Sequence, residues 1–313
     1  MLAYFLKRTV LMVPTLLLVA LMVFLLVHLI PGDPAIVMVG AEADPAAIEN
    51  IRRSLGLDQP LPIQFIDWFG RLLSGDFGKS ITSGIPVLET ILERFPTTLV
   101  LTTLAMLFSV AIAIPSGVLA AKFRNTGKDY LFMLVSLIGV SVPGFWLGLM
   151  GLLVFSVQLG WFPSSGYVPV WQDFWQGLNY MTLPSITLGF FMAAVVARMT
   201  RSSMLEVMRL EYVTHARAKG LSEWTVLLKH ALKNAFAPTL TTIGIQYGML
   251  LGGAVVTETV FGLPGLGRFV VQSIYGRDYP AVQGCILFIA LVYMFVNLAV
   301  DVLYKVFDPR VKF

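Results

Sequence analysis

The chain has 313 residues, of which 57% are hydrophobic and 13% charged, and its formal net charge is +4. Soluble globular proteins carry about 25% charged residues, so this composition excludes that class. The apolar runs are also too long for an outer-membrane barrel, whose strands alternate over about ten residues. The basic residues gather at the borders of the apolar runs, so no nucleic-acid partner is expected.

Six segments contain no Asp, Glu, Lys or Arg, and together they make up 164 residues. A helix needs about 20 apolar residues to cross a bilayer. The sequence therefore predicts an all-α polytopic membrane protein with six transmembrane helices, near residues 9–30, 98–121, 131–157, 182–201, 239–261 and 282–304.

The distribution of charge predicts the orientation of these spans. If the N-terminus is cytoplasmic, 15 of the 22 Lys and Arg residues lie on the inner side and 12 of the 18 acids lie outside. Cytoplasmic loops carry the excess of Lys and Arg, so both termini are predicted to be cytoplasmic. Residues 1–30 are expected to stay as an N-terminal anchor, because their apolar stretch is too long for a signal peptide and no cleavage site follows it.

The external segment 31–97 is predicted to fold as a small helical cap. Asp44 can cap a helix over residues 45–56, which opens with proline and ends at glycine. Further helices are predicted over 62–75 and 86–95, each with an apolar stripe. The cap either packs against the spans or contacts a soluble partner, and both interpretations stay open.

The remaining residues, 98–313, are predicted to form a five-span core with a cytoplasmic loop at 202–238. This loop is predicted to contain a helix over 203–219, a left-handed turn at Gly220 and a second helix capped by Ser222. One face of the second helix carries Trp224, Leu227, Leu228 and Ala231, and Pro238 marks the start of span five. A helical hairpin lying on anionic lipid is the alternative interpretation.

Span five carries two further candidate features. Glu258 lies near its outer end, and an ionisable residue in a membrane is a candidate for lining a polar pathway. A position at the membrane interface is the alternative interpretation. Gly244, Gly248 and Gly252 recur at a spacing of four, which is typical of a helix-packing face, either within this chain or across a dimer.

No set of residues predicts catalysis. The three histidines are dispersed and Cys285 is the single cysteine, so neither a metal site nor a nucleophile–base pair is expected. The run Gly78-Lys79-Ser80 lacks the first glycine of a phosphate-binding loop, because position 73 is leucine. The chain is therefore expected to be a non-enzymatic protein with no catalytic residues.

The cytoplasmic stretch Tyr212-Val213-Thr214-His215-Ala216-Arg217-Ala218-Lys219-Gly220-Leu221 resembles the coupling loop of bacterial ATP-binding-cassette (ABC) importer permeases. It is most similar to the dipeptide/oligopeptide group, which also includes glutathione and nickel permeases. The generic loop reads Glu-Ala-Ala-x-x-x-Gly, of which only Ala216 and Gly220 are kept. Further matching segments are 31–34, 55–60, 75–78, 257–261, 264–267, 277–283 and 297–301.

The resemblance implies a heteromeric importer in the bacterial inner membrane. This chain would pair with a second, similar permease, with two cytoplasmic ABC ATPases and with an external solute-binding protein. ATP and magnesium are expected on the ATPases, and no cofactor is expected on this chain. The residues implied at the ATPase contact are Tyr212, Thr214, Ala216, Arg217, Ala218, Lys219, Gly220 and Leu221.

The expected function is therefore that of a permease subunit for di- or oligopeptides, or for glutathione-like peptides. A nickel-chelate permease of the same group is the first alternative. A channel or secondary transporter that works without an ATPase is the second, and a membrane enzyme is a distant third. The loop at 202–238 discriminates between the importer and the channel, because only an importer needs it for docking.

Overall fold

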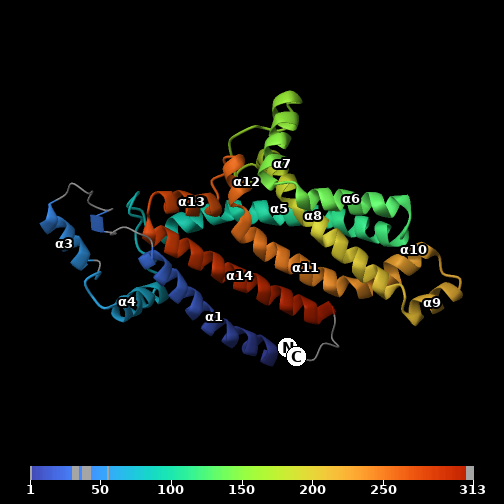
Figure 1. Ribbon diagram of the computed structural model, residues 1–313, viewed down its shortest axis with the longest axis horizontal. Helices are drawn as coiled ribbons and strands as arrows, with labels where there is room; N and C mark the ends of the chain where they lie inside the picture. The colour runs from blue at the N-terminus through green and yellow to red at the C-terminus, as the bar shows by residue number, and fades with distance from the viewer. Residues whose placement is uncertain (1, 30–34, 37–43, 55, 308–313) are drawn as a thin grey trace. The chain divides into compact units, whose positions relative to one another are not determined.

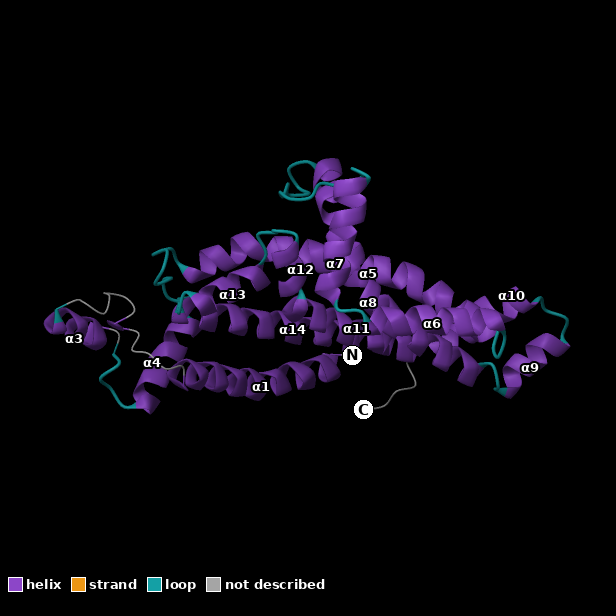
Figure 2. Ribbon diagram, turned by 45° about the horizontal axis from the view of Figure 1, so that its top comes forward, coloured by secondary structure: helices purple, strands orange, loops and turns teal. Residues whose placement is uncertain are grey.

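The computed structural model describes residues 2–29, 35–36, 44–54 and 56–307 (Figure 1). The regular structure of these residues is helical (Figure 2). One isolated β-bridge joins Lys79 and Pro86. Contacts within the chain divide it into two units, residues 1–96 with 265–294 and residues 97–264 with 295–313. The all-helical fold class is thus confirmed for the described residues.

Four helices are long and apolar enough to cross a membrane, and a bent pair makes a fifth if it counts as one span. The four are α1 (Leu2–Leu29), α5 (Val87–Lys122), α8 (Phe174–Val207) and α14 (Tyr279–Phe307). The protein is therefore a membrane protein with several candidate spans.

In the first unit, two of the helices predicted in segment 31–97 are present as α3 (Pro45–Ser54) and α4 (Leu61–Leu73). The carboxylate of Asp44 accepts a hydrogen bond of 3.0 Å from the amide of Ala46, as a helix N-cap does. Helix α4 packs on α1 through aromatic rings. The ring of Phe24 lies 5.4 Å from that of Phe65 and 5.6 Å from that of Trp68.

The third predicted helix, 86–95, is not separate. It forms the first turns of α5, which runs without interruption for 36 residues. Pro96 does not end α5, because a proline removes one helical hydrogen bond and membrane helices tolerate that loss when their neighbours support the backbone. Val87 and Ile91 of this stretch are fully buried against Leu266 at the start of α13 (Leu266–Tyr275).

A short hairpin before α5 is fixed to the start of α14 by one buried carboxylate. Asp278 accepts hydrogen bonds from the hydroxyl of Ser80, from the amide of Ile81 at 3.1 Å and from the hydroxyl of Thr82 at 3.0 Å. The amide of Ser80 also donates to the carbonyl of Ile85 at 2.9 Å, across the hairpin. Asp278 is fully buried, so these donors replace the water that its charge would otherwise need.

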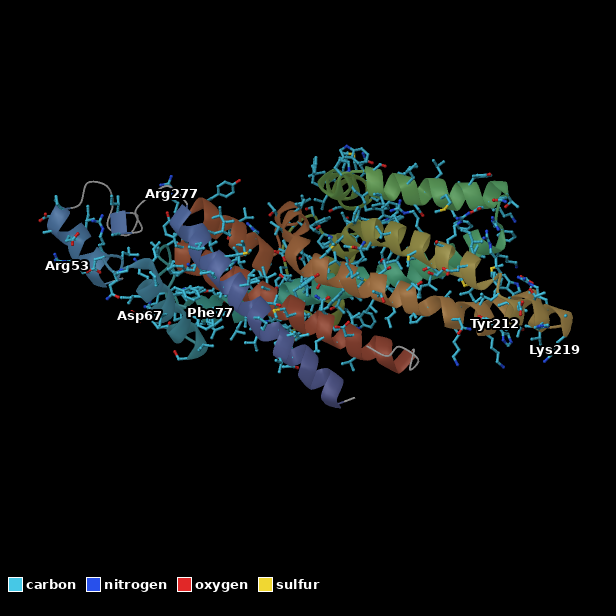
Figure 3. The ribbon with its side chains drawn as sticks, turned by 60° about the horizontal axis from the view of Figure 1, so that its bottom comes forward. Arg53, Asp67, Phe77, Tyr212, Lys219 and Arg277 are labelled. Atoms are coloured by element: carbon cyan, nitrogen blue, oxygen red, sulfur yellow. The ribbon has the colours of Figure 1, made fainter. Side chains whose placement is uncertain are left out.

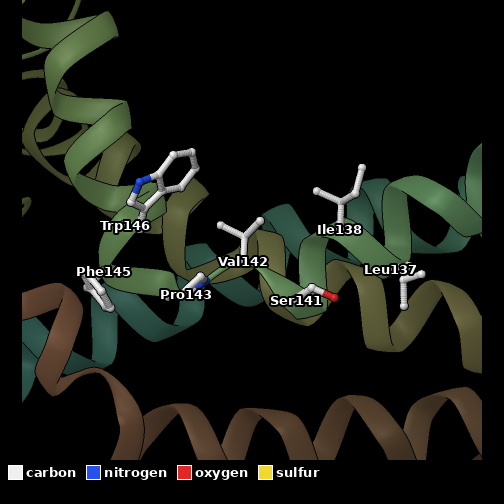
Figure 4. A pocket seen from close by; sticks show the side chains of 7 residues that line it. All are labelled: Leu137, Ile138, Ser141, Val142, Pro143, Phe145 and Trp146. Carbon is white, nitrogen blue, oxygen red and sulfur yellow. The ribbon is translucent and has the colours of Figure 1, made fainter.

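In the second unit, the segment expected as one span over 131–157 is bent. Helix α6 (Gly127–Ser141) is followed by α7 (Gly144–Gly151) and a π-helical end, η1 (Leu152–Gln158), at an angle of 99°. Val142 adopts an extended conformation because the ring of Pro143 disfavours helical geometry at the residue before it. The bend borders a groove of about 480 Å³ that is lined by Leu137, Ile138, Ser141, Val142, Pro143, Phe145 and Trp146 (Figure 4).

Helix α8 lies against α5 and α11 (Leu232–Gly253) at the centre of the second unit. The approach to α5 is closest at Gly189, where a Cβ atom would lie 2.4 Å from the carbonyl oxygen of Ala105. Pro238 lies inside α11, so the helix that contains the predicted transition into span five begins six residues earlier, at Leu232. The segment predicted as span five, 239–261, covers most of α11 and α12 (Val255–Val260).

Candidate functional site

The loop predicted at 202–238 contains a compact segment, which we call the elbow and define as residues 211–231. It contains α9 (Glu211–Ala218), the turn of α10 (Glu223–Thr225) and the π-helical segment η2 (Val226–Ala231). Figure 1 shows α9 and α10 beyond the ends of α8 and α11. The predicted order of helix, glycine turn and helix is therefore present.

The first helix of the loop is shorter than the predicted 203–219, because α8 ends at Val207 and α9 starts only at Glu211. In one continuous helix, residues 207 and 213 would lie about 120° apart around the axis. The break lets Val207 and Val213 enter the same buried cluster. Leu210, with an extended backbone, supplies the change of direction.

A hydrophobic cluster fastens the elbow to the transmembrane helices of its own unit. The cluster is formed by residues of α5, α8, α9, η2 and the start of α11. Its buried members are Val118, Ala121, Met204, Val207, Val213, Ala216, Val226, Leu227, Ala231 and Ala235. Because protein interiors are close-packed, displacement of the elbow is expected to be felt at the ends of α5 and α8.

Gly220 adopts a left-handed conformation with φ of +81°. Its amide donates a hydrogen bond of 2.9 Å to the carbonyl of Arg217 and so closes the end of α9. A Cβ atom at this position would meet nothing within 4 Å. Glycine is therefore required here by backbone conformation and not by space.

An ion pair closes the turn around Gly220. The guanidinium of Arg217 donates to the two carboxylate oxygens of Glu223 at 3.1 and 2.9 Å. These hydrogen bonds hold the pKa of Glu223 below its usual value and raise the pKa of Arg217. The hydroxyl of Ser222 accepts a hydrogen bond of 3.3 Å from the amide of Thr225, which confirms Ser222 as the helix cap.

The four residues predicted to share one face of the second helix differ in burial. Leu227 and Ala231 are fully buried, whereas Trp224 is 49% and Leu228 53% exposed. Trp224 belongs to α10, whereas the other three belong to η2, in which hydrogen bonds join residues five apart and the register differs from that of an α-helix. The elbow consequently presents Trp224 and Leu228 on its surface.

The other predicted contact residues divide into exposed and buried positions. Tyr212, Thr214, Ala218, Lys219 and Leu221 are exposed, whereas Ala216 is buried in the cluster beneath the elbow. Figure 3 shows Tyr212 and Lys219 in this part of the chain. The hydroxyl of Tyr212 also receives a hydrogen bond of 2.8 Å from Asn234, so it links α9 to α11.

Glu258 on α12 is fully buried within the second unit. Its carboxylate accepts a hydrogen bond of 2.6 Å from the hydroxyl of Thr98 on α5. The three glycines of α11 have different surroundings. A Cβ atom at Gly244 would lie 2.5 Å from Val300, at Gly252 it would meet nothing within 4 Å, and Gly248 is buried.

Two contacts near the elbow were not predicted. Asp129 at the start of α6 pairs with Arg201 on α8, and Lys122 at the end of α5 lies over the ring of Trp224 in α10. Both join residues that are far apart in the sequence. The sequence contains one indication of the first contact, because Asp129 is an acid among the basic residues at a predicted membrane border.

Comparison with protein families identifies the chain. Residues 113–313 match the family described as the inner membrane component of binding-protein-dependent transport systems, and residues 1–102 match its N-terminal family. The chain belongs to this permease family. It is therefore a multi-pass protein of the inner membrane and a non-catalytic transporter subunit.

Individual relatives are similar in sequence to this chain over its full length. A protein of Brucella abortus named as a peptide transport system permease is 45% identical over 313 residues, which is 100% of both chains. A glutathione transport system permease of Salmonella typhimurium is 47% identical, with the same coverage. Among solved structures, a chain of the inward-facing MetNI methionine ABC transporter is similar with a TM-score of 0.60 and 20% identity. That match covers 70% of this chain and 96% of the other, and it shows the fold alone.

Proposed function

We propose that this permease is a subunit of an ATP-driven importer that moves di- or oligopeptides, or glutathione-like peptides, across the bacterial inner membrane. The observation that carries the proposal is full-length identity of 45–47% to permeases named for peptide and glutathione transport. The elbow supports it, because its surface is built on a rigid cluster and suits docking of a cytoplasmic partner.

The proposed topology has six spans with both termini in the cytoplasm. The candidate spans account for five if α6 and α7 are counted together, and α11 with α12 supplies the sixth. The elbow carries Arg217, Lys219 and Lys229, which agrees with a cytoplasmic position under the positive-inside rule. Residues 31–97 then lie outside as the proposed cap, between the anchor 1–30 and the core 98–313.

The proposed partners are a second, homologous permease, two ABC ATPases that bind ATP and magnesium, and an external solute-binding protein. The elbow would seat on one ATPase through Tyr212, Thr214, Arg217, Ala218, Lys219, Gly220 and Leu221, with Ala216 beneath them in the buried cluster. The cap is proposed to face the binding protein. Closure of the ATPases would move the elbow as a rigid body and carry the attached helices with it.

Within the membrane, Glu258 is proposed to border the translocation pathway, where the hydroxyl of Thr98 holds its carboxylate in place. The glycine face is proposed to serve two contacts. Gly244 packs on Val300 of the same chain, whereas Gly252 has open space above it and would admit a helix of the second permease.

Purification from the native membrane in mild detergent tests the proposal. The tagged chain is expected to bring with it a second permease and ATPase subunits, and the reconstituted complex should couple peptide uptake to ATP hydrolysis. A stable homo-oligomer that transports without any ATPase would contradict the proposal and favour a channel or secondary carrier. Uptake of a nickel chelate in preference to peptides would contradict the proposed substrate only.

A further inference from the structure

The cytoplasmic end of α5 makes a polar contact with the elbow that the resemblance does not assign. Lys122 is the last residue of α5, and its ammonium nitrogen lies 3.6 Å from the centroid of the Trp224 ring. This distance is well inside the range of about 6 Å over which a cation is attracted to an aromatic face. Trp224 sits two residues after Ser222, the cap that begins α10.

Burial alone does not dictate this contact. Trp224 remains 49% exposed, and the apolar cluster beneath the elbow does not include its ring. The neighbouring Glu223 is held by Arg217, and the positive charge of Lys122 also contributes to lowering the pKa of Glu223. Two charged contacts thus hold the surface side of α10, one to α9 and one to α5.

Helix α5 also reaches the other proposed functional position in the same unit. Thr98, near the start of the second unit, donates to Glu258, and Lys122 at the end of the helix contacts Trp224. At 1.5 Å per residue, the 24 residues between them span about 36 Å. A displacement that enters α5 at its cytoplasmic end can therefore be carried along one continuous helix toward Glu258.

We propose that Lys122 is a positioning residue for energy coupling, which fastens Trp224, and with it the elbow, to the end of α5. When the partner ATPases close and move the elbow, this contact adds a polar link at the end of α5 to the apolar cluster through which Val118 and Ala121 already join α5 to the elbow. The proposal rests on the proposed importer function and deepens it, because it names the helix that carries the movement. A lysine that served only to bind a lipid phosphate would not depend on Trp224.

The test uses the complete importer in lipid vesicles and measures ATP hydrolysed and substrate transported in the same samples. Lys122→Met removes the charge and keeps the length of the side chain. It is expected to leave ATP hydrolysis in place and to lower substrate moved per ATP about two- to fivefold. Lys122→Arg keeps a cation that can lie over the ring, so it is expected to restore the ratio. Lys128→Met is the matched control, because Lys128 makes the same kind of contact with a ring outside the elbow, that of Phe123 at 4.6 Å.

A double-mutant comparison separates the contact from other roles of Lys122. Trp224→Leu should lower the substrate moved per ATP, as Lys122→Met does. The double variant should be no worse than Trp224→Leu alone, because the two substitutions remove the same interaction. Additive losses would overturn the proposal, and so would an unchanged ratio in Lys122→Met. Equal yields of assembled complex show that the variants fold.

The wild-type complex in the same experiment keeps the two proposals distinguishable. If the wild type transports without consuming ATP, the proposed importer function fails. If the wild type is coupled and the Lys122 variants are coupled equally well, only the role of Lys122 fails.

Discussion

Arg201 donates two hydrogen bonds of 2.7 Å to the carboxylate of Asp129, one from Nε and one from Nη2. Asp129 is 2% exposed and also accepts a hydrogen bond of 3.0 Å from the amide of Asn125. The pair joins the first turn of α6 to α8 in a bidentate geometry, which is the strongest arrangement of this kind. The pair therefore holds the start of α6, and the chain bends sharply after the other end of this helix.

Removal of one partner should destabilise the protein. Asp129→Asn leaves Arg201 partly buried without its counter-charge, and loss of one member of a buried pair costs about 3 kcal/mol or more. Thermal unfolding in detergent should show a lower midpoint for Asp129→Asn, and Arg201→Lys should have a smaller effect because it keeps a positive charge. Equal midpoints for wild type and Asp129→Asn would show that the pair does not stabilise the fold.

Substitutions at Gly220 should be graded by their tolerance of positive φ. A left-handed backbone costs most residues about 1–2 kcal/mol, whereas asparagine adopts it more readily. Gly220→Val should therefore reduce coupled transport more than Gly220→Asn. Gly220→Pro should reduce it most, because proline fixes φ near −65° and removes the amide that bonds to Arg217.

Gly144 provides the control, because its φ is not positive and a Cβ atom there would meet nothing within 4 Å. Gly144→Ala is expected to transport like the wild type. If Gly220→Pro inserted into the membrane and transported normally, the elbow would have no role in coupling.

Acid should loosen the elbow. The pKa of Glu223 is lowered in the folded protein because Arg217 donates two hydrogen bonds to its carboxylate. The stabilising contribution is thus complete at neutral pH, above the usual glutamate pKa of about 4.3. It is lost as the pH falls through the depressed value of the folded state.

Hydrogen exchange of residues 211–225, corrected for intrinsic rates, measures this effect. Protection should fall on acidification in the wild type. In Glu223→Gln it should be lower already at neutral pH and change less. The same pH dependence in both proteins would show that another group titrates.

The hairpin before α5 should depend on Asp278. Asp278→Asn keeps the shape of the side chain but cannot accept all the hydrogen bonds that Ser80, Ile81 and Thr82 donate. We expect faster hydrogen exchange over residues 79–86 in this variant, with a smaller effect for Ser80→Ala. Unchanged exchange would mean that the bridge between Lys79 and Pro86 suffices to hold the hairpin.

The sequence predicted most of the membrane helices, because apolar side chains without charges are needed along any segment that lipid surrounds. It failed at several helix boundaries that involve proline. Helices continue through Pro96 and Pro238, whereas the chain bends at Pro143, which lies in the middle of a charge-free run. Whether a helix tolerates the backbone hydrogen bond lost at proline depends on the neighbouring helices. A local sequence pattern carries no information about those neighbours.

The sequence predicted the local conformation of the elbow but not its contacts with other helices. The conformation of Gly220 and the cap at Ser222 follow from residue type within a few positions. The contact of Lys122 with Trp224 joins residues on different helices, and no periodicity encodes such a pair. The π-helical register of η2, where Leu228 is exposed, was not indicated by the apolar pattern.

Cross-linking from the tip of the elbow tests the central claim most directly. The chain has one cysteine, Cys285, which is buried, so Leu221→Cys introduces a distinct exposed thiol for a photoreactive label. Ser83→Cys on the exposed hairpin is the control. The account predicts an adduct with an ATPase subunit from position 221 and none from position 83. An ATPase that co-purifies but forms no adduct at 221, or forms one at 83 instead, would contradict it.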